Sequence, residues 1–316
     1  MSNPLHSSLT GPSAFTSSQP TPSKSLLTGL RADHFRHPLD LQATELLRQF
    51  PGLDLLVRNL LGPLGEKFFY LDNIASSVLV GENQLPHLYR LLQEACAILD
   101  LEPPQLYVRQ NPTPNAYTFA MRGRQPFIVL HTSLIDLLTE QEIQAVIAHE
   151  LGHLKCEHSV YLTPANLLIL AAGQLPGLGA AVAQTLQAQL LAWVRCAEFT
   201  CDRAALLVTQ DPAPMVSVLM KLAGGSPSLS AQLNYKAFLD QARAYDEIDM
   251  DELGQMLKEL RTSQLTHPVP VLRAREIDRW AQGDQYRTLL KNRYNKERSG
   301  KSPEGSGSST GGWRNW

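Results

Sequence analysis

The sequence is short of charge and of cysteine, and each shortage excludes a class of protein. Charged residues make up 18% of the 316 residues, and 28 basic against 30 acidic side chains leave a formal net charge of -2. Such a chain has no overall field that would attract nucleic acid or an anionic membrane, so we expect no nucleic-acid partner. Its four cysteines form no CxxC pair, which argues against a disulfide framework and favours a reducing compartment.

The first 30 residues lack the charged start and the apolar core of a secretory signal. Because residues 1–29 are rich in Ser, Thr, Pro and Gly, we predict a disordered N-terminal segment and a cytoplasmic protein. An organelle transit peptide is also Ser-rich and poor in acidic residues, so organelle targeting stays open. Residues 297–316 have a similar composition and are predicted to form a disordered tail.

No charged residue occurs between positions 159 and 194, yet this run is not a clean membrane span. A continuous span needs about 20 mainly apolar residues, whereas Gly, Pro and Gln interrupt this one. The run predicts an apolar helical hairpin over 159–194. It can lie on a membrane as a peripheral contact, pack against a partner or be buried in the core, and true transmembrane helices are a third reading.

The periodicity of the rest predicts an α+β, mostly helical fold. Residues 30–103 form a mainly helical N-terminal region that we expect to pack on a catalytic domain over 104–296. Short strands separated by turn residues are expected at 105–110, 116–121 and 127–131, in a small antiparallel sheet. A helix should begin near Thr139, because Thr139 and Glu142 fit a capping box.

The sequence His149-Glu150-Leu151-Gly152-His153 lies on this predicted helix and has the HExxH pattern of zinc peptidases. Residues four apart share one helix face, so both imidazoles can bind one tetrahedral zinc ion. Glu150 lies about 100° around the helix from His149, beside the ion. From there it can act as the general base for metal-activated water.

A catalytic zinc ion keeps three protein ligands and one open position, so a third ligand is needed. Glu198 and Asp202 are two carboxylates four residues apart on a helix expected from about Ala192 to Thr209. Glu198 would complete a His₂Glu site, and Asp202 would accept the free N–H of a ligating imidazole. Cys196 and Cys201 are rival ligands, and three further histidines are weaker candidates: His131, His158 and His267.

The HExxH motif followed by ExxxD across an apolar hairpin resembles the gluzincin family of HtpX-type proteases and CAAX prenyl proteases. Two further segments carry the likeness, Asn115-Ala116-Tyr117 before the motif and Thr266-His267-Pro268 with Arg273 after it. The resemblance spans about 104–277. It implies a zincin-like catalytic domain with one zinc ion per chain, and proteolysis at or near membranes.

The resemblance also implies a role for His267, and backbone pairing suggests one for the strand before the motif. His267 would lie near the reacting carbonyl and stabilise the oxyanion. The strand of Asn115, Ala116 and Tyr117 would bind a polypeptide substrate in extended form. We therefore expect a zinc endopeptidase acting on membrane-associated or misfolded proteins. The alternatives are a non-catalytic zinc scaffold or chaperone-like polypeptide-binding protein, and an integral-membrane protease of lipidated tails.

Overall fold

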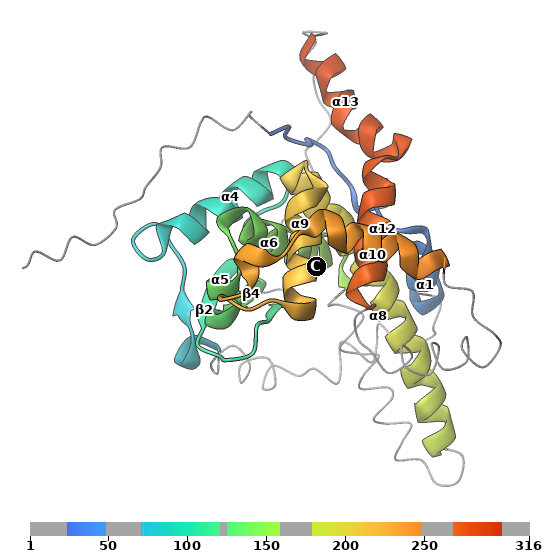
Figure 1. Cartoon of the computed structure of the whole chain (residues 1–316), viewed down its shortest axis with the longest axis horizontal. Helices are drawn as coiled ribbons and strands as arrows, with labels where there is room; N and C mark the ends of the chain where they lie inside the picture. The colour runs from blue at the N-terminus through green and yellow to red at the C-terminus, as the bar shows by residue number, and fades with distance from the viewer. Residues whose placement is uncertain are drawn as a thin grey trace, which may run out of the picture.

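The computed structural model describes residues 24–48, 71, 73–120, 125–158, 179–247 and 268–298 (Figure 1). Its elements are mostly helices around one small sheet. The strands are β1 (Val78–Leu79), β2 (Gln105–Arg109), β3 (Ala116–Phe119) and β4 (Phe127–His131). The helices are η1 (Ala32–His34), α1 (Pro38–Arg48), α4 (Pro86–Leu99), α5 (Thr132–Leu137), α6 (Glu140–Lys155), α8 (Gly179–Thr209), α9 (Pro212–Gly224), η2 (Ser230–Gln232), α10 (Tyr235–Glu247), α12 (Pro270–Ala281) and α13 (Asp284–Arg298).

The sheet is mixed, which corrects the expected antiparallel sheet. Its strand order is β1-β2-β4-β3. Strands β3 and β4 pair antiparallel, as two strands joined by a short turn do, while β2 lies on the other side of β4 and pairs with it in parallel. The expected turn around Gly123 lies outside the described residues. The short strand β1, which the sequence did not predict, pairs antiparallel with β2.

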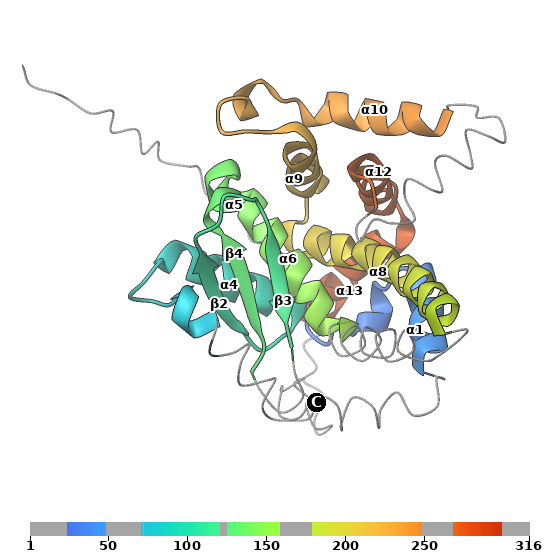
Figure 2. The same cartoon turned by 90° about the horizontal axis from the view of Figure 1, so that it is seen from below.

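Both faces of β4 are buried, and successive side chains alternate between two apolar clusters. Ile128 and Leu130 belong to the main core, which also contains the buried faces of α4 and α6. Phe127 and Val129 belong to a smaller cluster with Tyr107 on the opposite face. Figure 2 shows α6 beside β3, between the sheet and α8. The sheet therefore supports the helix that carries the HExxH motif.

Helix α6 begins as the sequence predicts. The Thr139 side chain accepts a hydrogen bond from the Glu142 backbone N–H, and the Glu142 carboxylate accepts one from the Thr139 N–H. Two backbone donors that a helix leaves unpaired at its N-terminus are thereby satisfied. Lys221 and Ser217 on α9 also donate to the Glu142 carboxylate, both at 2.6 Å. The start of the motif helix is thus fixed to α9.

Helices α6 and α8 approach each other closely at Gly152. A Cβ atom at this position would lie 2.9 Å from the Ala204 Cβ and 3.0 Å from the Cys201 Cα. These separations are below ordinary contact, so only glycine permits this spacing of the two helices. Gly152 precedes His153 directly, and Cys201 precedes Asp202. The close approach therefore occurs at the level of the candidate site.

Helix α8 is one continuous helix, which corrects the expected start of a separate helix near Ala192. The sequence change from an uncharged to a charged stretch does not interrupt it, since neither Gly nor Pro occurs between 180 and 209. The second half of the predicted hairpin over 159–194 is therefore the first half of α8, and residues 159–178 lie outside the described residues. Among the helices that the structure describes, none is both long and apolar enough to cross a membrane.

The described N-terminal segment packs on the helical core. Leu27, Leu30 and Phe35 are buried, and the Leu27 N–H donates to the Ile98 carbonyl at the end of α4. Residues 24–29 are thus ordered, although the composition of 1–29 predicted disorder. The buried side chains of Leu27 and Leu30 contribute the apolar area that anchors this segment.

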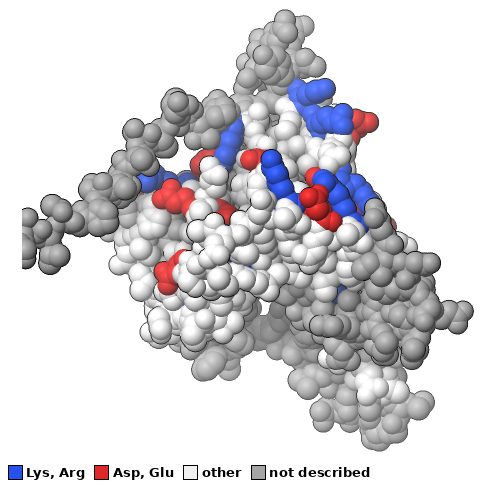
Figure 3. Space-filling view, viewed as in Figure 1, with Lys and Arg blue, Asp and Glu red and all other residues white. Residues whose placement is uncertain are grey.

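Charge is sparse on the surface as well as in the sequence. On the face of Figure 3, Lys and Arg side chains are interspersed with Asp and Glu, and wide areas between them carry no charge. No single sign dominates this face. The surface seen there agrees with the near-neutral net charge of the sequence.

The contact at Gly152 can be tested with Gly152→Ala. The added methyl group must push α6 and α8 apart, so we expect a loss of about 1–3 kcal/mol in the free energy of unfolding, measured with urea. Gly224→Ala is the matched control, because a Cβ at Gly224 meets nothing within 4 Å. Equal free energies of unfolding for the two variants would show that Gly152 does not determine the spacing of α6 and α8.

Candidate metal centre and active site

Three side chains of the HExxH helix and α8 meet in the buried core. The Glu198 carboxylate on α8 lies 3.4 Å from His149 Nε2 and 3.3 Å from His153 Nε2, through different oxygens. Both imidazoles project from one face of α6, as residues four apart must. The structure thus brings together the three residues that the sequence suggested as zinc ligands.

The spacing of these atoms suits a tetrahedral ion. Ligand atoms about 2.0–2.1 Å from a zinc ion at tetrahedral angles lie about 3.3–3.4 Å from one another. Each distance from a Glu198 oxygen to an imidazole is close to this edge length, with a different oxygen facing each ring. Two imidazole nitrogens and one carboxylate are also a known donor set of catalytic zinc. The residues present therefore fit the ion.

Cys201 forms a second set with the same two histidines, and the ligand atoms of His149, His153 and Cys201 lie within 4.8 Å of one another. Its thiol lies 3.7 Å from Nδ1 of His158, and that same nitrogen contacts His153 Nδ1, on the opposite side of the His153 ring from Glu198. Burial, together with nearby acidic groups, raises the Cys201 pKa well above its usual value. Glu198 is the better third ligand. Cys196 is only half-buried.

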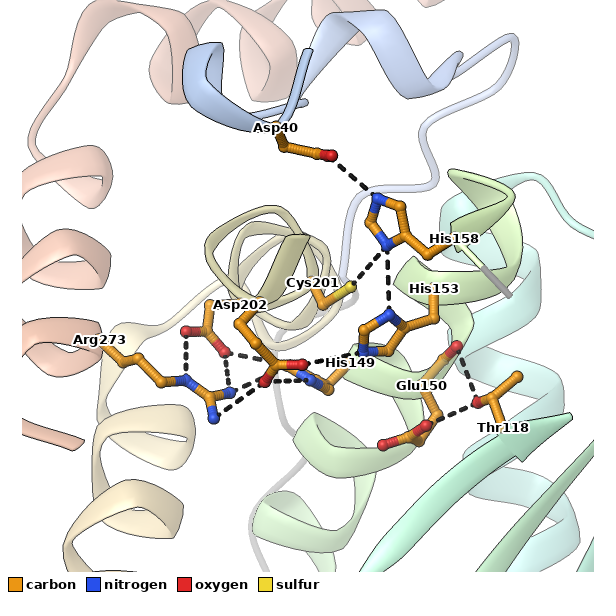
Figure 4. Close-up of polar contacts among 10 residues, drawn as sticks. Asp40, Thr118, His149, Glu150, His153, His158, Cys201, Asp202 and Arg273 are labelled. Carbon is orange, nitrogen blue, oxygen red and sulfur yellow. Dashed lines mark hydrogen bonds and ion pairs between the residues drawn. The ribbon is translucent and has the colours of Figure 1, made fainter. Parts of the chain in front are cut away.

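Asp202 and Arg273 stand behind His149 (Figure 4). Asp202 Oδ1 lies 3.1 Å from His149 Nδ1, where it accepts the ring N–H. Arg273 on α12 donates to both oxygens of Asp202, at 2.9 and 2.6 Å, and lies 3.1 Å from the Glu198 carboxylate. Asp202 has the position that the sequence predicted. The sequence singled out Arg273 only through the resemblance and gave it no role.

The buried charges around His149 determine which of these side chains are protonated. Burial alone would raise the pKa values of Glu198 and Asp202, but the Arg273 cation and the His149 ring lower both. Burial alone would lower the His149 pKa, but Glu198 and Asp202 outweigh it and raise that pKa to about 9. Both carboxylates are therefore ionised at neutral pH. In the metal-free chain His149 binds the proton that a metal ion would displace.

Glu150 is buried and its carboxylate faces the sheet. The Thr118 hydroxyl on β3 lies 2.6 Å from the Glu150 carboxylate and 3.2 Å from the Glu150 backbone carbonyl. The Thr118 side chain points toward α6 (Figure 4), while its neighbours Tyr117 and Phe119 pack on the opposite face of the sheet. Thr118 therefore holds the carboxylate in place. The sequence did not predict this contact, because only the fold brings residues 118 and 150 together.

The other predicted residues differ in their placement. Ala116 and Tyr117 lie in β3, and the Asn115 carbonyl just before it accepts the His131 backbone N–H at 3.0 Å. Strand β3 is at the edge of the sheet, where β4 is its one partner among the described strands. His131 binds the Thr113 carbonyl through Nδ1 at 2.8 Å instead of joining the candidate site. His267 lies outside the described residues.

Comparison with known proteins gives a consistent set of matches. The sequence model of peptidase family M48 matches residues 82–281. The chain is 59% identical over 266 residues to plastoglobule-localized metallopeptidase 48, chloroplastic, of Arabidopsis thaliana, covering 84% of this chain and 77% of that protein. It is 28% identical over 189 residues to protease HtpX homolog 2 of Methanosarcina mazei, covering 51% of this chain and 64% of that protein.

Among solved structures, the chain matches the crystal structure of S. mikatae Ste24p. The TM-score is 0.40 at 16% sequence identity, and the match covers 76% of this chain and 62% of that chain. The chain thus spans less than two thirds of the length of S. mikatae Ste24p and of the Methanosarcina protein.

Arg273→Met tests the pairing of buried charges. Removing the cation leaves two buried carboxylates uncompensated, so we expect the metal-free chain to lose about 3–5 kcal/mol in urea unfolding. The pKa values of both carboxyls are depressed in the folded chain, so their contribution is present at neutral pH and is lost as pH falls. The deficit of the variant should therefore begin to narrow below about pH 4, near the carboxyl pKa of the unfolded chain, and shrink further as the pH falls toward the depressed folded values.

Arg279→Met is the matched control on the same helix. Arg279 is 66% exposed and pairs with Glu276 at the surface, so its loss should cost less than about 1 kcal/mol. Equal losses for the two variants, or a deficit of Arg273→Met that does not change with pH, would contradict the paired-charge account.

Proposed function

The chain belongs to peptidase family M48, and on that premise we propose that it is a zinc-dependent endopeptidase with one zinc ion per chain. M48 metallopeptidases are zinc-dependent, and relatives of this chain are named as proteases. In this proposal His149, His153 and Glu198 hold the metal. The observation that carries it is the Glu198 carboxylate, whose oxygens lie 3.4 and 3.3 Å from the two imidazole Nε2 atoms.

A zinc ion held by His149, His153 and Glu198 would supply Lewis-acid chemistry, activating a water molecule and polarising the scissile carbonyl. The Glu150 carboxylate accepts the proton of the attacking water and then delivers it to the nitrogen of the leaving amine. The Thr118 hydroxyl, 2.6 Å away, fixes the direction of that carboxylate. Proton transfer needs such a fixed geometry, because a donor and an acceptor must lie within hydrogen-bond reach.

The carboxylate of Asp202 orients the other candidate ligand region, at His149. Because it accepts the N–H at Nδ1 of His149, it leaves the lone pair of His149 at Nε2, facing Glu198. Arg273 keeps Asp202 ionised and in place through two hydrogen bonds. Asp202 and Arg273 thus orient the proposed metal ligand His149 and do not need to touch the substrate.

We place the substrate, an extended polypeptide, along the edge strand β3. An edge strand offers backbone N–H and C=O groups that bind a peptide with little demand on its sequence. Asn115, Ala116 and Tyr117 lie at the start of this edge, and Thr118 connects the strand to Glu150. Membrane-associated or misfolded proteins would supply such extended segments, and the predicted hairpin over 159–194 is the proposed contact with a membrane.

The Arabidopsis relative is named as chloroplastic and plastoglobule-localized. Its 59% identity over 84% of this chain supports an organelle location in preference to the cytoplasmic one expected from the sequence. We place the protein in the chloroplast, at plastoglobules.

Glu150→Gln tests the proposed reaction. The amide keeps the shape of the side chain but cannot accept a proton, so we expect zinc content to remain at one per chain and casein hydrolysis to fall by at least about 100-fold. A chelator should abolish hydrolysis by the unchanged chain, and added zinc should restore it.

Glu140→Gln is the control, because Glu140 is exposed on the first turn of the same helix. It should cleave casein at the rate of the unchanged chain. Hydrolysis that survives Glu150→Gln would rule out this base. A chain that binds zinc and never cleaves would instead favour the non-catalytic scaffold.

The proposed location is tested by fractionating cells and probing with an antibody raised against this chain. The protein should be recovered with chloroplast plastoglobules and enriched there over the stroma. Recovery in the cytosol would contradict the location and leave the proposed chemistry intact.

A further inference from the structure

A second buried acid–histidine pair lies behind His153, outside every step proposed so far. His158 Nε2 lies 3.0 Å from Asp40 Oδ2, and His158 Nδ1 lies 3.2 Å from His153 Nδ1. Neither Asp40 nor His158 is exposed to solvent. Asp40 belongs to α1, upstream of the matched family region at 82–281. Figure 4 shows the three side chains in a row that leads from α1 to the metal centre.

We propose that Asp40 and His158 form a hydrogen-bond relay that sets which nitrogen of His153 faces the metal. The N-terminal segment would then complete the metal centre of the M48 domain. This inference rests on the proposed function, because it concerns the metal ligand His153. Asp40 and His158 are positioning residues in it, since both act through His153.

The position of Asp40 is fixed from several sides. Its Oδ2 accepts a hydrogen bond from the Thr200 hydroxyl at 2.7 Å, and its Oδ1 accepts one from the Thr44 hydroxyl at 3.0 Å. Arg36 lies 3.8 Å from Oδ1 and also donates to the Cys156 carbonyl at 2.9 Å, at the end of α6. The Asp40 carboxylate therefore accepts two hydrogen bonds, in addition to the one from His158.

The relay follows from the donors and acceptors along the row. A carboxylate only accepts, so His158 must present an N–H at Nε2 to Asp40. A neutral imidazole has a single N–H, which leaves His158 Nδ1 as an acceptor. His153 must then donate from its own Nδ1. Its lone pair is consequently at Nε2, the atom that lies 3.3 Å from Glu198.

The surroundings of His158 fix its orientation. The Trp193 ring stands edge-on to the His158 ring, with centroids 5.7 Å apart, and Trp193 Nε1 donates to the Thr44 hydroxyl that binds Asp40. The ring of His158 is thus held by packing as well as by hydrogen bonds.

The two metal ligands of α6 are then supported in parallel ways. Asp202 accepts directly from Nδ1 of His149, at 3.1 Å. His153 reaches a carboxylate as well, but through one additional imidazole. Partners of this kind fix the tautomer of a ligating histidine, and their loss weakens metal binding by about 10–100-fold. The pattern explains why a histidine and an aspartate are both buried behind the site.

The test measures zinc affinity of the full chain, freed of metal and titrated against a chelating indicator. Asp40→Asn keeps the size of the side chain but presents an amide N–H that can compete for the nitrogens of His158. We expect its zinc dissociation constant to rise by about 10–100-fold. His158→Leu should weaken binding to a similar extent. His158→Gln should retain most of the affinity, because one amide can donate to Asp40 and accept from His153.

Glu142→Gln is the matched control. It also removes the charge of a buried carboxylate on the α6 network, but at the far end of the helix, where its partners are Lys221 and Ser217. It should lower stability and leave the zinc dissociation constant within about twofold. Cobalt(II) absorption gives a second readout, since Asp40→Asn should shift the visible bands and Glu142→Gln should not.

The outcomes separate the relay from the proposed function. Folded Asp40→Asn that binds zinc as tightly as the unchanged chain would overturn the relay alone, as would an equal loss of affinity in Glu142→Gln. An unchanged chain without zinc affinity would overturn the proposed function together with the relay. Weakened zinc binding in Asp40→Asn and His158→Leu, with affinity retained in His158→Gln, would support the relay.

Discussion

The close contact of α6 and α8 at Gly152 is the constraint on which the site depends. Glycine allows the two backbones to approach to a distance that a Cβ atom would prevent. The three candidate ligands come from these two helices, and their side chains are too short to meet across a wider gap. The geometry of the candidate metal centre is therefore determined by helix packing, and each imidazole needs only a small number of orienting contacts.

In the part of the chain that the structure describes, the buried carboxylates around this contact have charged or hydrogen-bonding partners. Glu198 and Asp202 share Arg273, Glu142 pairs with Lys221, and Asp40 lies among His158, Thr200 and Thr44. Burying an ionised carboxylate is costly unless a charge or several hydrogen bonds compensate it. Arg273 comes from α12, Lys221 from α9 and Asp40 from α1, and all three helices are far from α6 in the sequence. The core thus gains its long-range specificity from polar groups as well as from apolar packing.

Local patterns in the sequence predicted the parts of the site that a single helix determines. The HExxH spacing, the capping box at Thr139 and the ExxxD spacing each depend on one helical repeat, and the structure has all three on helices. Strand positions were also predicted, since the expected 127–131 coincides with β4. The parallel pairing of β2 and β4 was not, because strand order depends on which side of β4 each neighbour packs.

Contacts between distant segments were beyond any pattern. Asp40 and His158 are 118 residues apart, and Thr118 is 32 residues from Glu150. No spacing rule connects such pairs, so His158 could be suggested only as a weak ligand and Asp40 not at all. His158 lies beyond the end of α6, which ends at Lys155, so the helical spacing that places His149 and His153 on one face does not extend to it.

The location of Asp40 also bears on what the catalytic unit is. Residues 82–281 match the family, yet the carboxylate nearest the back of His153 comes from α1. Segment 24–48 is attached both by apolar side chains such as Phe35 and by the polar contacts of Arg36 and Asp40. A ligand that binds only the folded arrangement stabilises every contact that the arrangement requires. If His153 is oriented through His158, metal binding and docking of α1 must strengthen each other by the same free energy, because linkage between two binding events is reciprocal. The N-terminal segment is then part of the metal centre in the thermodynamic sense, although it contributes no ligand.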